Sequence, residues 1–263
     1  MTTRKRADVL LVERGLFDSR TRAQAAIAAG RVTADGILLR KASDSVAPDA
    51  RLEATDHPWV SRGALKLVAA LDHFGFAPAG HVCLDIGAST GGFTEVLLER
   101  GARRVYAVDV GRGQLHARLR GHPDVVSLEE TDIRALDPAR LAEPPDFATI
   151  DVSFISLKLV LPALDALLRR PAQLVALIKP QFEAGRKHLK KGIVRDPAVH
   201  AAVCDDIAAF AASHGWDVSG VIPSPIEGGE GNKEFLLGAS APNPKFAHIA
   251  PQGLLRTSGS KGH

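Results

Sequence analysis

Short apolar runs alternate along most of the chain with segments whose apolar residues recur at helical spacing. Short runs bounded by turn residues predict buried strands, and the segments between them predict crossover helices. This alternation indicates an α/β domain with a doubly wound, mainly parallel sheet. The helix that ends at Leu168 should bend at Pro162. The helix that begins at residue 62 should be capped by Ser61. Strands are expected at 82–85, 104–109, 124–128, 147–150, 173–178, 216–222 and 233–237, and helices at 62–71, 93–100, 157–168 and 196–213.

The first part of the chain has a different pattern, two short helices followed by a hairpin. Helical spacing covers residues 8–14 and 21–29, and the glycine after each, Gly15 and Gly30, suits a left-handed C-cap. Asp35-Gly36 then separates two β-prone runs, which predicts a tight hairpin. The expected organisation is a small α+β domain over 1–55, a linker over 56–61, the α/β domain over 62–240, and a disordered tail over 241–263.

Composition adds a cellular setting and a charge asymmetry. The 263 residues include two cysteines, Cys83 and Cys204, whose spacing fits neither a metal site nor a disulfide framework. There is no signal-like start and no apolar run of membrane-spanning length, so a cytoplasmic protein is expected. Through Thr55 the chain carries ten Lys+Arg against seven Asp+Glu, which equals the net charge of +3 of the whole chain. This basic excess indicates an anionic partner for the first domain.

A glycine-containing loop follows the first strand of the large domain and leads directly into a helix. In parallel α/β sheets this turn holds a nucleoside cofactor, because glycines let the backbone approach the ligand. The loop reads Asp-x-Gly-x-Ser-x-Gly from Asp85, and a carboxylate at that place would repel the pyrophosphate of a dinucleotide. S-adenosylmethionine (SAM) has a cationic end and no phosphate, so it is the expected cofactor. The loop residues expected around it are Asp85, Gly87, Ser89, Gly91, Gly92 and Phe93.

Two further carboxylates follow the next strands and extend this cofactor site. Asp109 closes the second strand about twenty residues after the loop, where a carboxylate accepts hydrogen bonds from ribose hydroxyls. Asp132 follows the third strand and is placed to reach the adenine. One such carboxylate alone is more often a polar strand end facing water. Three in order after a glycine loop favour the cofactor site.

Four other ionisable residues stand where the sheet would bring them to the same crevice. Lys66 lies on the helix before the first strand, Asp151 and Lys179 follow strands, and Glu234 follows a glycine-rich loop. Strand ends of a doubly wound sheet converge on the ligand crevice. Each residue alone is more often a solvated surface group, but the four together with a SAM loop indicate catalysis. The ten histidines form no ligand cluster, so no metal is expected.

The first domain resembles the S4 RNA-binding module. The resemblance rests on Arg-x-Asp-x-x-Leu-x-x-x-Gly-Leu from Arg6, followed by Ser19-Arg20, Gly30-x-Val32, Asp-Gly and Lys41. It implies recognition of folded RNA by shape and phosphate contact. Asp18 weakens the positive field there, and a solvated basic face is the alternative. The implied contacts are Arg4, Arg6, Arg20, Arg22 and Lys41, and a basic loop in the large domain adds Arg186 and Lys187.

The whole chain except its tail resembles the TlyA family, in which an S4 module precedes a Rossmann-like, SAM-dependent methyltransferase domain of the FtsJ type. The matching blocks are 59–67, 85–94, 151–156, 178–183 and 231–234. The family's Lys-Asp-Lys-Glu catalytic set then falls on Lys66, Asp151, Lys179 and Glu234. The resemblance implies 2′-O-methylation of a cytidine ribose in 16S or 23S ribosomal RNA within ribosomal subunits.

Other classes of function stay open at this point. A membrane-active hemolysin would need an amphipathic or spanning segment exposed to lipid, whereas the apolar runs here alternate as in a buried α/β core. A non-catalytic RNA-binding protein that holds SAM would leave the two lysines Lys66 and Lys179 unexplained. A methyltransferase for a small molecule or a protein would leave the S4-like domain unexplained.

Overall fold

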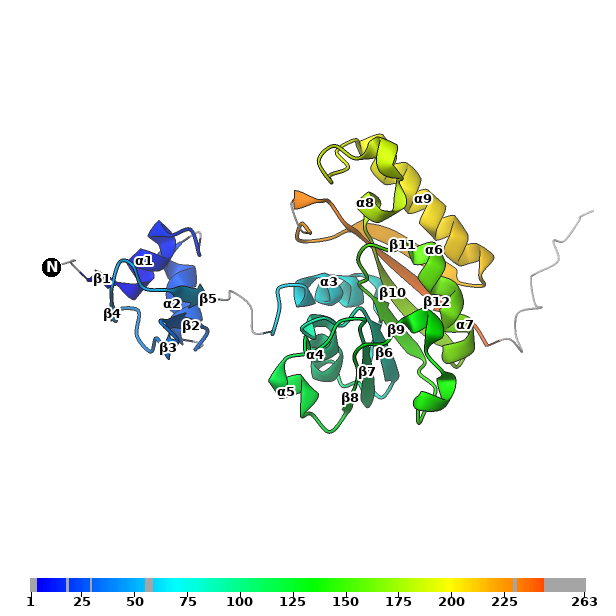
Figure 1. The fold of residues 1–263 in the computed structure, drawn as a ribbon, viewed down its shortest axis with the longest axis horizontal. Helices are drawn as coiled ribbons and strands as arrows, with labels where there is room; N and C mark the ends of the chain where they lie inside the picture. The colour runs from blue at the N-terminus through cyan, green and yellow to red at the C-terminus, as the bar shows by residue number, and fades with distance from the viewer. Residues whose placement is uncertain (1–3, 18, 29, 55–58, 229–230, 244–263) are drawn as a thin grey trace, which may run out of the picture.

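The computed structural model describes residues 4–17, 19–28, 30–54, 59–228 and 231–243 (Figure 1). Asp18, residues 56–58 of the expected linker, and the expected disordered tail beyond Asn243 lie outside the described residues. Both cysteines are buried and free, as their spacing predicts. Within the described ranges, no helix combines the length and the apolarity that crossing a membrane requires.

The N-terminal domain folds as its local signals predict. Helices α1 (Ala7–Glu13) and α2 (Arg20–Ala28) are followed by left-handed glycines, Gly15 at φ 70° and Gly30 at φ 69°. Strands β2 (Val32–Ala34) and β3 (Ile37–Leu38) pair across Asp35 and Gly36, both with positive φ, which is the turn that suits a two-residue hairpin. The predicted helices and hairpin are therefore confirmed.

Three short strands of this domain are not predicted by the sequence. Strand β5 (Leu52–Ala54) pairs with β2, and β1 (Lys5–Arg6) pairs with β4 (Ser45–Val46). Each is too short to show a hydrophobic alternation, so long-range pairing and not local pattern forms it. The apolar sides of the two helices and of β2 share one small core that includes Leu11, Ile27 and Val32.

The large domain is built on a seven-stranded sheet with the order β11-β12-β10-β9-β6-β7-β8. Strands pair in parallel except β12, which runs antiparallel to both β10 and β11. The strands are β6 (Val82–Ile86), β7 (Arg104–Val108), β8 (Val125–Leu128), β9 (Phe147–Ile150), β10 (Ala172–Ile178), β11 (Asp217–Pro223) and β12 (Phe235–Ala241). The expected doubly wound α/β fold is confirmed, with one antiparallel strand inserted near its edge.

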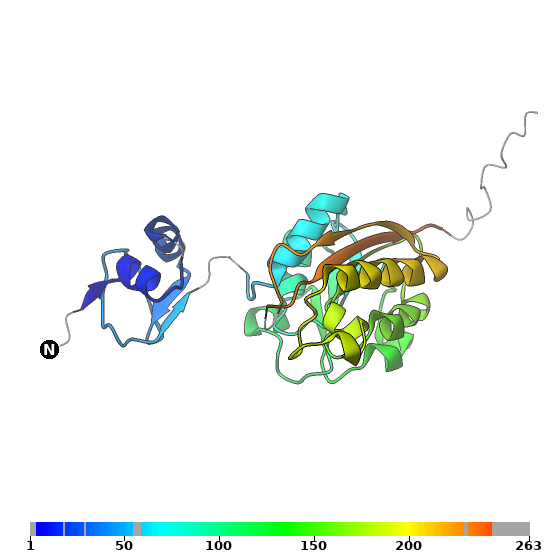
Figure 2. The same cartoon turned by 90° about the horizontal axis from the view of Figure 1, so that it is seen from above.

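Helices cover both faces of this sheet, as Figure 2 shows for α3 and α9. Successive residues of β10 point to opposite sides, so Val175 packs with α3 and α4 while Leu174 packs with the helices of the other face. The helices are α3 (Ala64–Phe74), α4 (Gly92–Glu99), α5 (Ala117–Arg120), α6 (Leu157–Val160), α7 (Leu164–Leu167), α8 (Pro180–Glu183) and α9 (Pro197–Ser213). Short 3₁₀ turns occupy Ile133–Ala135, Pro138–Arg140, Leu161–Ala163 and Arg186–His188.

Helix starts and bends show where local signals succeed and where one fails. The helix predicted over 157–168 is divided into α6 and α7 by a 3₁₀ turn at Leu161–Ala163, which contains Pro162, the position of the predicted bend. Asp196 caps α9 by accepting from the N–H of Ala198. The cap expected at Ser61 is wrong: Gly63 is the N-cap of α3 and no side chain caps it. The main-chain oxygen of Ser61 accepts from the N–H of Ala64 instead, at 3.3 Å.

Candidate active site

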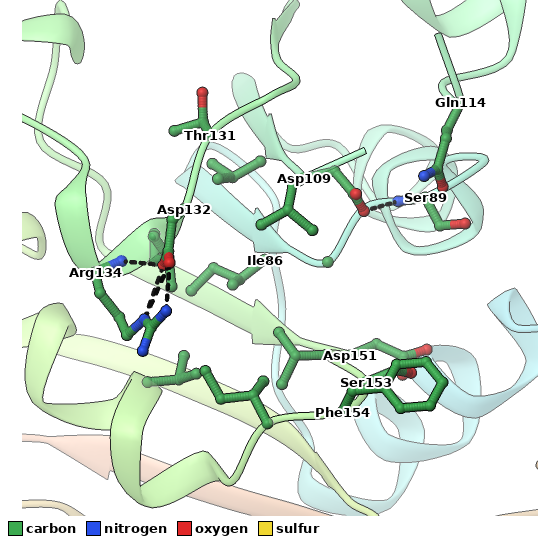
Figure 3. A pocket seen from close by; sticks show the side chains of 17 residues that line it. Ile86, Ser89, Asp109, Gln114, Thr131, Asp132, Arg134, Asp151, Ser153 and Phe154 are labelled. Atoms are coloured by element: carbon green, nitrogen blue, oxygen red, sulfur yellow. Dashed lines mark hydrogen bonds and ion pairs between the residues drawn. The ribbon is translucent and has the colours of Figure 1, made fainter. Parts of the chain in front are cut away.

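A cavity of about 430 Å³ opens at the carboxyl ends of β6, β7 and β9. Three predicted carboxylates line it, Asp109, Asp132 and Asp151, together with Gly87 and Ser89 of the glycine loop (Figure 3). Its apolar walls come from strand ends and from the segment after β9, including Ile86, Val108, Ile133 and Val152. This mixture of apolar walls and a few convergent polar groups is typical of a small-molecule site.

Asp109 ties the glycine loop to the end of β7. Its Oδ2 accepts from the N–H of Ser89 at 2.8 Å, and its Oδ1 accepts from the N–H of Gly111 at 2.7 Å. The side chain stays partly exposed to the cavity. A carboxylate oxygen can accept more than one hydrogen bond, so Asp109 can also accept from ribose hydroxyls.

Asp132 lies across the cavity and is held by Arg134. The two form an ion pair of 2.5 Å, and the Asp132 carboxylate also accepts from the N–H of Arg134 at 2.9 Å. These hydrogen bonds lower the pKa of Asp132 below its ordinary value, and the one from the Arg134 side chain has the largest effect. Asp132 is therefore an ionised acceptor at the end of the site where the sequence places the adenine.

Glycine at position 87 is required by the neighbouring backbone. Gly87 has φ 82°, and a Cβ there would lie 2.4 Å from the main-chain oxygen of Asp151. A side chain cannot fit between these two segments, so only glycine lets the glycine loop reach the segment after β9. At Gly92 the close neighbour is a side chain, since the Oγ of Ser61 would lie 2.2 Å from an added Cβ. Gly87 thus brings two backbone segments together, and the cofactor contact that the sequence pattern predicts for these glycines stays a prediction.

Asp85 is placed differently from the other carboxylates. It is fully buried and accepts from the hydroxyls of Thr94 at 2.6 Å and Thr149 at 2.9 Å. Burial raises its pKa to about 6. Asp85 does not line the cavity. It joins α4 to β9 underneath the glycine loop. Its direct contact with a cofactor stays a prediction, and this geometry does not support it. The expected cofactor residues Gly91, Gly92 and Phe93 also lie outside the cavity lining.

The four expected catalytic residues form two buried ion pairs. Lys66 Nζ lies 2.6 Å from Glu234 Oε2, and Lys179 Nζ lies 2.6 Å from Asp151 Oδ1. Lys66, Lys179 and Glu234 are each less than a tenth exposed. Because Ile178 pairs with Phe235 in antiparallel strands, Lys179 and Glu234 come next to each other at the end of this pairing. The structure thus brings together residues from α3, β9, β10 and the start of β12.

Two residues beside these ion pairs belong to a sequence motif, but the sequence predicts no role for them. Ser153 Oγ accepts from Lys179 Nζ at 2.9 Å and so helps to orient the lysine. Phe154 lines the cavity, is 89% exposed, and has φ 64°, which is rare for a non-glycine residue. Its ring centroid lies 5.0 Å from that of Phe182. The outward direction of the Phe154 ring cannot be predicted from the sequence, because it depends on the backbone conformation and on the packing around it.

In the N-terminal domain, a buried carboxylate organises two of the expected RNA contacts. Asp8 is fully buried and pairs with Arg6 at 3.0 Å and Arg20 at 2.8 Å, while Gln24 Nε2 donates to it at 2.7 Å. The hydrogen bond from Arg6 is the largest cause that holds the pKa of Asp8 well below its usual range. Both guanidinium groups stay about half exposed. Arg6 and Arg20 therefore form one fixed basic pair, with only part of their charge neutralised.

The other expected RNA contacts lie at the surface. Arg4 donates to the main-chain and side-chain oxygens of Ser45, and Arg22 and Lys41 are exposed. In the large domain, Arg186 and Lys187 are exposed on a 3₁₀ turn. Their positions leave them accessible to a large ligand, and their contact with RNA stays a prediction.

The fold and the site together define a class. A seven-stranded sheet with one inserted antiparallel strand, a glycine loop after its first parallel strand and acidic residues after the next strands are the features of a SAM-dependent methyltransferase domain. The model of FtsJ-like methyltransferases matches residues 59–241, and that of the S4 domain matches residues 5–52. The chain belongs to the TlyA family of S4-containing, FtsJ-like methyltransferases.

Relatives of known name support this assignment over nearly the full chain. The 16S/23S rRNA (cytidine-2′-O)-methyltransferase TlyA of Mycobacterium tuberculosis is 47% identical over 90% of this chain and 90% of its own. Hemolysin A of Brachyspira hyodysenteriae is 36% identical over 88% of this chain and 98% of its own. A solved Streptococcus thermophilus structure that carries a hemolysin name is 43% identical, covers 92% and 90% of the two chains, and superimposes with a TM-score of 0.71.

Proposed function

We propose that this protein transfers a methyl group from SAM to the 2′-hydroxyl of a cytidine ribose in ribosomal RNA within a ribosomal subunit. The observation that carries the proposal is the adjacent placement of two buried ion pairs, Lys66–Glu234 and Lys179–Asp151, beside the cavity. The relatives from Mycobacterium tuberculosis and Campylobacter jejuni are named as cytidine-2′-O-methyltransferases, the first of 16S and 23S rRNA and the second of 23S rRNA. A substrate within ribosomal subunits implies that the protein acts in the cytoplasm.

The cavity fits the proposed cofactor in size and in chemistry. Its volume of about 430 Å³ suits a nucleoside-sized ligand, and it combines apolar walls with carboxyl groups that can accept hydrogen bonds. Asp109 would accept from the ribose hydroxyls of SAM, and Asp132 would accept from its adenine amine. SAM supplies an electrophilic methyl group on a sulfonium when it is bound.

The reaction requires that a weak nucleophile be aligned and deprotonated. A ribose hydroxyl gains from in-line placement and from a positioned group that takes its proton. Lys179, in its neutral form, is the group assigned to take the proton. Asp151 and Ser153 fix the direction of its Nζ, and Asp151 stabilises the ammonium after transfer. Lys66 and Glu234 would hold the ribose, since each offers a buried hydrogen-bonding group at the same place.

Surface features beside the site suit a flipped nucleotide. Phe154 presents an exposed ring at the cavity, and bases of unpaired nucleotides stack on such rings. The S4 domain, through Arg6 and Arg20, would supply phosphate contacts that position the enzyme without reading the sequence.

The test is transfer of tritium from labelled SAM to purified small and large ribosomal subunits, followed by nucleoside analysis. Formation of 2′-O-methylcytidine by the wild type and not by Lys179→Ala is the expected result. A non-catalytic SAM-holding protein would bind SAM and transfer nothing. A membrane-active hemolysin would instead release dye from lipid vesicles, which is measured in parallel.

A further inference from the structure

A second cavity, of about 430 Å³, lies between the start of α9 and the start of β12, and the function described above does not use it. It is lined by Ile193, Val194, Arg195, His200, Gly231 and Lys233. His200 is buried, and its Nε2 lies 2.9 Å from the main-chain oxygen of Val194. The centroid of the His200 ring also lies 5.6 Å from that of Phe235. His200, on α9, therefore fixes one wall of the cavity through contacts to the segment before α9 and to β12.

Positive charge dominates this cavity. Arg195 and Lys233 are exposed, and neither has a hydrogen bond or an ion pair within the described part of the chain. No carboxylate of the described residues lines the cavity. The nearest carboxylates along the chain are engaged, since Asp196 caps α9 and Glu234 pairs with Lys66. Arg195 and Lys233 are therefore available to an anion from outside the chain.

The cavity is joined directly to the catalytic ion pairs. Lys233 precedes Glu234, and burial alternates along this segment, with Asn232 and Glu234 buried and Lys233 exposed. Asn232 Nδ2 donates to the main-chain oxygen of Gly192 at 3.3 Å, which ties the segment before β12 to the segment before α9. Glu234 thus faces Lys66 while the residue before it faces the basic cavity.

We propose that the Arg195–Lys233 cavity binds a backbone phosphate of the substrate RNA close to the nucleotide whose ribose is methylated. This inference rests on the proposed function, because that function places the ribose of the substrate at Lys66 and Glu234. The chemistry is that of a phosphodiester held by one guanidinium and one ammonium. Such a contact fixes the strand next to the ribose position at Lys66 and Glu234, because Lys233 directly precedes Glu234.

The experiment measures RNA binding by the full chain as a function of salt. Lys233→Gln and Arg195→Gln, singly and together, are compared with Lys233→Arg and with Arg100→Gln. Arg100 follows the end of α4 that is away from the glycine loop and forms an exposed ion pair with Asp72, so Arg100→Gln removes one charge at a distance from the site. Removing one phosphate contact reduces the slope of log K against log salt by about 1.

A slope reduced by about 1 in each single Gln variant, and unchanged in Lys233→Arg and Arg100→Gln, is the expected result. The KM for ribosomal subunits should rise in the same Gln variants while SAM affinity stays constant. A slope that no Gln variant changes would overturn the phosphate site and leave the proposed function standing. If the wild type transfers no methyl group, the proposed function fails, whatever the slopes show.

Lysine acylation read by mass spectrometry separates the two sources of phosphate. RNA should protect Lys233 from acylation, and inorganic phosphate at the same phosphate concentration should not. Equal protection by inorganic phosphate would define a small-anion site and overturn the assignment to RNA.

Discussion

At the scale of single residues, the site depends on charges that are buried in matched pairs. Removing one member of a buried ion pair leaves the other charge without a partner. The resulting loss of folding stability is larger than the stability that the pair itself contributes. Lys66–Glu234 and Lys179–Asp151 are such pairs, and both take their members from separate elements. Substitutions here must therefore be tested for folding as well as for activity.

Lys179→Ala should lose most of the turnover, by about 10²- to 10⁴-fold, because a positioned general base contributes that much. Lys179→Arg should not restore it, since a guanidinium keeps its proton at any workable pH. Single-turnover methyl transfer, with SAM affinity measured by calorimetry, separates this loss from weaker binding. Near-normal turnover in Lys179→Arg would show that charge and position suffice and that solvent takes the proton.

Asp109→Ala should weaken SAM binding without unfolding the domain. Hydrogen bonds to a charged acceptor contribute roughly 1.5–3 kcal/mol each. The variant also frees the N–H groups of Ser89 and Gly111, which loosens the glycine loop. Calorimetry with SAM is the measurement, and an unchanged affinity would remove Asp109 from the cofactor site.

Asp85 should make stability fall with rising pH. Its pKa in the folded state is about 6, above the ordinary value of 3.8. Between pH 3.8 and pH 6 the folded state therefore keeps a proton on Asp85 that the unfolded state has already lost. The free energy of unfolding therefore decreases from about pH 4 to pH 6, by on the order of 3 kcal/mol for this group. Asp85→Asn removes the titration while keeping a partner for Thr94 and Thr149.

Urea unfolding at pH 4.5 and pH 7 measures how much the free energy of unfolding changes with pH in the wild type and in Asp85→Asn. The other carboxylates change this free energy equally in both proteins, so the difference between the two is due to Asp85. The wild type should lose more stability than the variant on going to pH 7. Parallel changes in the two proteins would mean that Asp85 is ionised in the fold throughout this range.

At the scale of elements, the site is made where loops after neighbouring strands touch. Gly87→Ala should separate the glycine loop from the segment after β9, because its Cβ would lie 2.4 Å from the Asp151 oxygen. The positive φ alone costs about 1–2 kcal/mol, and the displacement of Asp151 should lower turnover further. Thermal unfolding and methyl transfer are measured together.

Gly80→Ala is the matched control for this prediction. Gly80 also has a positive φ, 76°, but no atom lies within 4 Å of an added Cβ. It should show only the backbone cost, with turnover unchanged. Equal behaviour of the two variants would mean that the contact between the loop and Asp151 does not matter.

At the scale of the whole molecule, RNA recognition and methyl transfer belong to different parts of the chain. Deleting the residues before Thr55 should abolish methylation of ribosomal subunits and leave SAM affinity near normal, because phosphate contacts position the enzyme. Lys41→Gln in the full chain should reduce the salt slope of RNA binding by about 1. Full activity of the truncated protein on subunits would contradict the RNA-binding role of the S4 domain.

Local sequence signals are sufficient for most elements. Asp35-Gly36 predicts a hairpin, Pro162 a bend and Asp196 with Pro197 a helix start, because each depends on the conformational preference of a few adjacent residues. The cap predicted at Ser61 is wrong because packing sets the turn before α3: Ser61 Oγ sits against Gly92 of another helix. Short strands with no turn signal beside them, such as β5, carry too little pattern to be found, whereas Asp35-Gly36 marks the equally short β2 and β3.

The sequence by itself determined the class of fold, the glycine loop and the strand ends at which Asp109, Asp132, Asp151 and Lys179 stand. Those follow from periodicity and from the rule that strand ends converge. Only the tertiary structure decided which charges meet. Lys66 and Glu234 are 168 positions apart and pair because β12 inserts beside β10. Asp85 turns inward to two threonines, because the hydrogen-bond partners that determine a side chain's direction come from other elements of the fold.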